Sequence, residues 1–200
     1  MAARLVALSG LDCRVVTYRQ VSPRLVAEVG PRAIVLSGAT ADWAEYDRDA
    51  LKGLLALILD PPVSLLGICA GHQLIGFAHG ASWGPVRELA VGPGAPGEGR
   101  QAGEWGYLTV RLDIRCPIFG GLPEEARFFQ AHYWQLLEVP AGFALRASSP
   151  TSPIQAIERT DGRVFGVQFH PEAYDSRHPQ GAVVLRNFFQ QSLSHGRPVR

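Results

Sequence analysis

The sequence predicts an α/β fold in which a mostly parallel central sheet carries helices on both faces, with a smaller antiparallel sheet beside it. In the first half of the chain, short and almost continuously apolar runs alternate with segments of helical spacing. This alternation is typical of parallel strands that are buried on both faces. In the second half, strand-like runs follow one another closely with turns between them, which favours antiparallel pairing.

The first expected element is a helix, not a strand. Residues 1–9 have helical spacing and end at Gly10, although a doubly wound sheet usually opens with a strand. Either the first strand is missing or supplied differently, or this helical interpretation is wrong. A strand is expected next at 13–18, then a short helix at 23–29 with a serine cap and a proline in its first turn, and then a buried strand at 33–36.

The remaining elements complete a single domain over residues 1–200, because no repeat or linker divides them. Helical spacing at 46–59 stops before two prolines, and a buried strand at 63–68 runs into a helix at 70–79. A glycine-rich loop is expected at 92–103. The later strands and the final helix are expected, in chain order, at 107–112, 126–130, 143–147, 153–158, 164–169 and 180–193.

Composition and charge exclude several classes of protein. With 46% hydrophobic and 18% charged residues, the chain has enough apolar material for a full core. A net charge of +1 gives no global field, so neither nucleic acid nor a membrane is an expected partner. No apolar run is long enough to span a bilayer, and the first residues lack the layout of a signal peptide. Three widely spaced cysteines are typical of reduced thiols, so a cytoplasmic location is expected.

One cysteine lies in a pattern expected of a nucleophile. Residues 67–73 read Gly-Ile-Cys-Ala-Gly-His-Gln, so that a strand runs into Gly-x-Cys-x-Gly and a helix follows. The glycines permit a cramped turn that lifts the Cys69 side chain off the end of the sheet. The amino terminus of the helix then favours the thiolate, which is the reactive form. The alternative is a buried structural cysteine, and this motif alone does not decide between the two.

A candidate base follows much later in the chain. Residues 166–172 read Gly-Val-Gln-Phe-His-Pro-Glu, a hydrophobic strand that ends in histidine, proline and glutamate. His170 is suited to take the proton of Cys69 and deliver it to a leaving amine, while Glu172 holds the imidazole in the right tautomer. Taken alone, His170 would be a strand-end histidine and Glu172 a solvated turn residue. The two motifs together are far more specific than either one.

In both motifs the chain resembles the triad type of class I glutamine amidotransferase domain, which implies a flavodoxin-like fold. That family carries a Gly-x-Cys-x-Gly-x-Gln elbow and a later Gly-x-Gln-Phe-His-Pro-Glu, and both occur here in that order. The resemblance extends from Cys13 to Phe189. The end of the chain, with Gly181 and Asn187-Phe188, is most similar to the GMP-synthase branch of the family.

The resemblance implies a role for each residue that matches the two motifs. Cys69 attacks the side-chain amide of glutamine and forms a glutamyl thioester. His170 assists the departure of ammonia, and Glu172 orients His170. Backbone amides of Gly38 and Ala70 hold the oxyanion that forms during the attack.

The resemblance also implies substrate contacts, with two departures from the family pattern. Gln73 matches the glutamine that helps to bind the amino-acid end of the substrate, and His132, Tyr133 and Trp134 fall where the family contacts that end. Trp134 stands where an acidic residue often pairs with the substrate ammonium, which leaves room for a γ-glutamyl compound instead of free glutamine. Residues 38–40 read Gly-Ala-Thr where the family has Gly-Gly-Pro. Alanine resists positive φ, so this loop either sits differently or changes when a partner binds.

These roles imply a glutaminase domain that releases glutamate and ammonia for a synthetase on another chain, since residues 1–200 hold no ATP-binding or synthetase sequence. A free-standing γ-glutamyl hydrolase or peptidase and a catalytically silent binding module are the alternatives. No cofactor is expected, because the glycines at 92–99 do not form a nucleotide-binding turn. No metal is expected either, because the Cys-x-x-His spacing of Cys69 and His72 lacks a second pair.

Overall fold

The computed structural model describes residues 1–41, 43–97 and 101–195. Its helices are α1 (Ala2–Ser9), α2 (Pro23–Val29), α3 (Arg48–Leu59), α4 (Ala70–Ala78) and α5 (Gln180–His195). Its strands are β1 (Ile34–Leu36), β2 (Leu65–Ile68), β3 (Trp83–Pro85), β4 (Leu89–Val91), β5 (Gly103–Leu112), β6 (Glu125–His132), β7 (Trp134–Leu136), β8 (Phe143–Ser148), β9 (Ala156–Arg159) and β10 (Val164–Val167).

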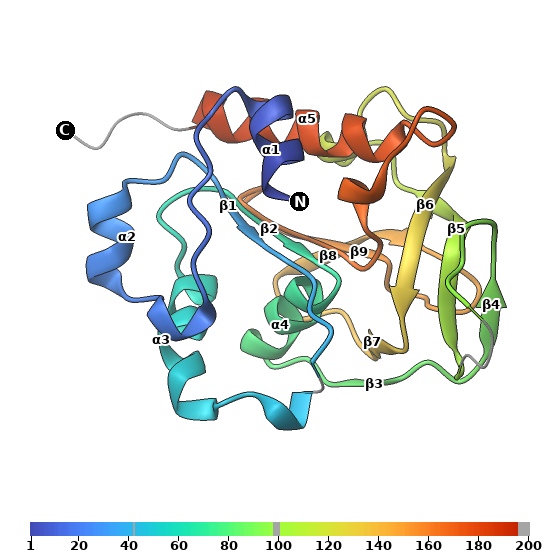
Figure 1. The fold of residues 1–200 in the computed structure, drawn as a ribbon, viewed down its shortest axis with the longest axis horizontal. Helices are drawn as coiled ribbons and strands as arrows, with labels where there is room; N and C mark the ends of the chain where they lie inside the picture. Colours follow the sequence, from blue (N-terminus) through green and yellow to red (C-terminus); the bar gives the residue numbers. More distant parts are fainter. Residues whose placement is uncertain (42, 98–100, 196–200) are drawn as a thin grey trace.

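The strands form one large and one small sheet within the described residues (Figure 1). The large sheet has the order β1-β2-β10-β9-β8-β5-β4, and β6 pairs with β5. β1, β2 and β10 are parallel to one another, and antiparallel pairing begins at β9. The small sheet is the antiparallel pair β3–β7. The predicted α/β fold with its smaller antiparallel sheet is therefore confirmed.

Helices cover both faces of the parallel strands (Figure 1). α1 and α5 pack on one face, whereas α3 and α4 pack on the other. β2 is buried throughout, with Leu66 and Ile68 in the first core and Leu65 in the second. Successive side chains of a strand point to opposite faces, so a strand between two helical layers is apolar at every position.

Several helix boundaries follow from local chemistry. The predicted helix at 1–9 is confirmed as α1, and it ends at Gly10 with φ 69°. The side chain of Ser22 accepts a hydrogen bond from the amide of Leu25 and caps α2. α3 begins at Arg48, two residues later than expected, because the side chain of Asp47 caps it.

The strand expected at 13–18 does not form. Residues 11–17 have no regular structure, and a 3₁₀ turn, η1 (Tyr18–Gln20), follows them. β1 pairs with β2 on one edge, and its other edge has no strand partner in the described part of the chain. A cavity of about 1180 Å³, lined by residues 11–19, 33–39 and part of α1, lies beside that edge. The β-branched residues of 13–18 line this cavity and form no ladder with the second edge of β1.

Candidate active site

Cys69 lies at the sharp turn between β2 and α4. Its φ is 52° and its ψ is −107°, and no other described non-glycine residue has a positive φ. Such a backbone is strained for an L residue and persists only where the surroundings impose it. A Cβ on Gly67 would lie 2.5 Å from the carbonyl oxygen of Gly71, and one on Gly71 would lie 2.6 Å from that of Leu36. Only glycine fits at these two positions, so the Gly-x-Cys-x-Gly pattern builds this turn.

His170 follows β10, the strand next to β2. The parallel register pairs Val167 with Ile68, so the residues that follow the two strands leave the sheet at the same edge. Gly38 lies close to both: a Cβ placed on it would meet Cε1 of His170 at 3.0 Å and Cβ of Cys69 at 3.4 Å. The structure therefore brings the candidate nucleophile, the candidate base and Gly38 together.

Glu172 lies against the imidazole of His170. Nδ1 of His170 donates a hydrogen bond to Oε1 of Glu172 at 2.9 Å, and both side chains are mostly buried. Burial opposes the charged imidazole, but interactions with Cys69 and Glu172 outweigh it and raise the pKa of His170 to about 10. Nε2 of His170 is buried without a well-aligned hydrogen-bond partner among the described residues. With Nδ1 held by Glu172, Nε2 is the nitrogen left for proton transfer.

Gly38 and Ala70, the predicted oxyanion residues, both line the cavity of about 1180 Å³. Ala70 is the first residue of α4, so its amide belongs to the helix end that lacks intrahelical acceptors. The cavity therefore reaches the candidate active site from the side of β1.

Three of the four predicted substrate contacts form one buried cluster. Nε2 of Gln73 donates to the Trp134 carbonyl at 2.7 Å and to Oε1 of Gln168 at 3.1 Å. Oε1 of Gln73 accepts from Nε1 of Trp43 at 3.2 Å. Nδ1 of His132 lies 3.0 Å from the same Trp134 carbonyl. The fourth predicted contact, Tyr133, lies in the bend between β6 and β7 that this cluster supports.

Sequence reasoning missed the polar groups behind this cluster. Nε2 of His132 lies 2.9 Å from Oε2 of Glu104. Oγ of Ser149 and Nε2 of Gln155 each donate to the same carboxylate at 2.5 Å. Glu104 lies outside the strand expected at 107–112, so the sequence indicated neither its burial nor its partner. Gln168, by contrast, lies inside the second motif.

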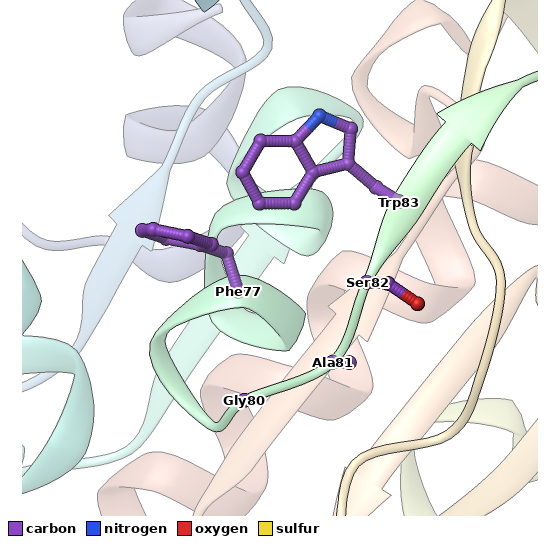
Figure 2. Close-up of a pocket in the computed structure, with 5 residues that line it drawn as sticks. All are labelled: Phe77, Gly80, Ala81, Ser82 and Trp83. Carbon is purple, nitrogen blue, oxygen red and sulfur yellow. The ribbon is translucent and has the colours of Figure 1, made fainter.

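His72 and the second pocket of the molecule do not contribute groups to the candidate active site. His72 is buried against Gly166, and burial lowers its pKa to about 3. In the described ranges, no group of His, Cys, Asp and Glu is placed to hold a metal ion, and no helix has the length and apolarity to cross a membrane. A second pocket of about 350 Å³ lies at the carboxyl end of α4, where Phe77 and Trp83 meet edge to face (Figure 2). Its lining residues hold no titratable group.

Comparison with known proteins identifies a family over most of the chain. The family described as glutamine amidotransferase class-I matches residues 1–192. The glutamine-hydrolyzing GMP synthase of Lactococcus lactis subsp. cremoris is 30% identical over 191 residues, 94% of this chain and 33% of that protein. One subunit of the glutamine-hydrolyzing GMP synthase of Thermococcus kodakarensis is 36% identical over 126 residues, 63% of this chain and 58% of that protein.

A solved structure is similar throughout. It is a putative GMP synthase subunit from Thermoplasma acidophilum, with a TM-score of 0.78 and 29% identity over 96% of this chain and 86% of that one. The chain spans only 33% of the length of the Lactococcus relative, so that protein has regions with no counterpart in these residues.

Proposed function

The chain belongs to the class I glutamine amidotransferases, and on this premise we propose that it hydrolyses the side-chain amide of glutamine through a cysteinyl thioester. The observation that carries the proposal is the strained Cys69 at the end of β2, placed beside the His170–Glu172 pair at the end of β10. Nucleophile, base and orienting group in this arrangement are what acyl transfer requires.

The proposed reaction has two steps. The sulfur of Cys69 attacks the amide carbon, and the C–N bond breaks as His170 gives a proton to the departing ammonia. Water then attacks the thioester, His170 takes its proton, and glutamate leaves with Cys69 restored. Glu172 keeps Nδ1 of His170 protonated through both steps.

Backbone amides would stabilise the oxyanion that forms in each step. We assign this role to the amides of Gly38 and Ala70, because Gly38 lies against Cys69 and Ala70 opens α4. A donor of this kind contributes on the order of 3–4 kcal/mol to the transition state in comparable enzymes.

The names of the relatives support a partner for this chain. One is a GMP synthase that is described as glutamine-hydrolyzing, and another is a single subunit of such an enzyme. We propose that ammonia formed at Cys69 passes to a synthetase on another chain, which consumes it in an amination.

Glutamate release from purified protein tests the proposal, alone and with candidate synthetases. Cys69→Ala is expected to abolish release. Cys116→Ala is the matched control, because Cys116 is buried in the core and burial raises its pKa to about 12. Absence of cysteine-dependent turnover under both conditions would overturn the proposal.

Trp134 favours a second candidate, a free-standing γ-glutamyl hydrolase. Its indole stands where the family often has an acidic residue, and its Nε1 is buried without a partner among the described residues. Comparing kcat/KM for glutamine with kcat/KM for γ-glutamyl amides that carry a blocked amine separates the two functions. Preference for the blocked compounds would favour the hydrolase.

A further inference from the structure

We propose that Glu104 and His132 form a buried positioning pair that fixes the amide of Gln73 and so selects substrates with a free amino group. The inference rests on the proposed hydrolysis at Cys69 and names two residues that act behind the reacting groups. Glu104 and His132 lie directly opposite each other on β5 and β6, and their side chains are 1% and 2% exposed.

The direction of the hydrogen bonds follows from what each group can do. A carbonyl oxygen only accepts, so Nδ1 of His132 donates to the Trp134 carbonyl. Glu104 meets the other ring nitrogen and is itself held by Ser149 and Gln155. The imidazole is therefore held at both nitrogens. Its fixed orientation in turn fixes the position of the Trp134 carbonyl, to which Nδ1 donates.

The Trp134 carbonyl transmits this constraint to Gln73. The carbonyl has two lone pairs, and His132 and Nε2 of Gln73 occupy both of them. Nε2 of Gln73 also faces Oε1 of Gln168, a second acceptor. Two acceptors on one side force the amide nitrogen of Gln73 to that side, so its oxygen points the other way.

The fixed amide then provides an acceptor for an ammonium group. Oε1 of Gln73 receives one hydrogen bond, from Nε1 of Trp43, and retains a second lone pair. The Trp134 carbonyl has none left, so it cannot bind the substrate amine itself. The oxygen of Gln73 would thus accept a hydrogen bond from the free amine of the substrate. It would replace the acidic side chain that the family often has at position 134.

A buried carboxylate–histidine pair is weak evidence for a role in stability, because replacing such a pair by well-packed apolar residues is often neutral or stabilising. We therefore assign this pair a positioning role. A second ionic cluster on the same sheet provides the matched control. Arg146 bonds Asp113 and Glu158 at 2.7 Å, and Asp113 and Arg146 are about a quarter exposed or less.

The experiment compares Glu104→Gln and His132→Gln with Asp113→Asn on two substrates, glutamine and glutaramate, which lacks the amino group. We expect KM for glutamine to rise about 10-fold in both positioning variants with kcat within about 2-fold of wild type. KM for glutaramate is expected to stay unchanged, and Asp113→Asn is expected to change neither value. Equal losses on both substrates, or an unchanged KM for glutamine, would overturn the inference.

Two further measurements keep the test independent of folding and of the proposed function. If Glu104→Gln does not fold, Ser149→Ala removes one donor to the carboxylate and is expected to raise KM for glutamine about 2-fold to 3-fold. Wild-type turnover tests the hydrolysis itself. If wild-type turnover is absent, the rate of Cys69 alkylation is measured instead of KM. An amine-bearing chloroketone analogue of glutamine then replaces glutamine, and iodoacetamide replaces glutaramate as the compound without the amino group. Equal slowing with both reagents, or with neither, would count against the pair.

Discussion

The two sides of β2 differ sharply. On one side, β10 is buried at every residue and continues into the antiparallel strands. On the other side, β1 is half-buried and borders a cavity of about 1180 Å³. Leu5 is the one buried residue among the described positions up to 47, whereas β2 and β10 are buried throughout.

The difference divides the candidate site into two parts. Cys69, His170 and Glu172 all belong to the closed side, where packing fixes them. Gly38, a proposed oxyanion donor, belongs to the open side. Arg4 of α1 links the two sides, because its guanidinium donates to the carbonyls of Glu172 and Tyr174. Through Arg4 and Gly38, a change on the open side would therefore reach the candidate base and nucleophile on the closed side.

The largest expected effect lies on the closed side. His170→Asn should lower kcat for glutamine hydrolysis by about 10⁴-fold, since it removes the proton donor and acceptor of both steps. Steady-state glutamate release measures this loss, and circular dichroism verifies that the variant is folded. A change of Ala39 to Gly, on the open side, should leave kcat within about 10-fold of wild type. A larger loss from Ala39→Gly than from His170→Asn would reverse the comparison.

Stability should show the same contrast. Phe165 in β10 is fully buried, so Phe165→Ala should lower the free energy of unfolding by about 3–5 kcal/mol. Val16 lies on the open side and is 38% exposed, so Val16→Ala should cost less than about 0.5 kcal/mol. Urea denaturation of both variants measures the difference. Similar values at the two sites would show that the open side is packed as well as the closed side.

Hydrogen exchange should resolve the two edges of β2 residue by residue. Amides of β1 that face the cavity should exchange at least about 100-fold faster than amides of β2 and β10, because no strand covers them in the described part of the chain. Native-state exchange followed by NMR gives the rates. Protection of β1 equal to that of β10 would contradict an open edge.

A further prediction concerns pH. Because the pKa of His170 is raised from 6.5 to about 10, its charged form stabilises the fold fully below pH 6.5, and this contribution is lost as pH rises toward 10. The Tm of wild type should therefore fall over this range relative to the Tm of His170→Asn, which lacks the imidazole. A constant difference between the two proteins would show that the folded state does not favour the imidazolium.

Motifs whose geometry is local could be predicted from the sequence. The Cys69 turn depends on Gly67 and Gly71, and His170 and Glu172 are two residues apart, so the chain itself fixes their relation. Once the fold class was predicted, the two motifs were expected at the ends of parallel strands, and the pairing of β2 with β10 brings them together.

Features that depend on pairing between distant strands could not be predicted. Glu104 meets His132 only because β5 and β6 align them, and nothing within either strand specifies that register. The failure at 13–18 is of the same kind, because β propensity is realised only through pairing, and these residues form no ladder with β1. The short strands β3 and β7 were also missed, because each has three residues and gains its structure from the other.

The open edge of β1 has a consequence for assembly. Its unpaired backbone groups are a template for one more strand, as at any sheet edge. Residues 11–19 and part of α1 line the cavity along that edge, so growth there is capped from the outside. Residues 11–19 and α1 thus shield this edge from edge-to-edge pairing with another copy of the chain.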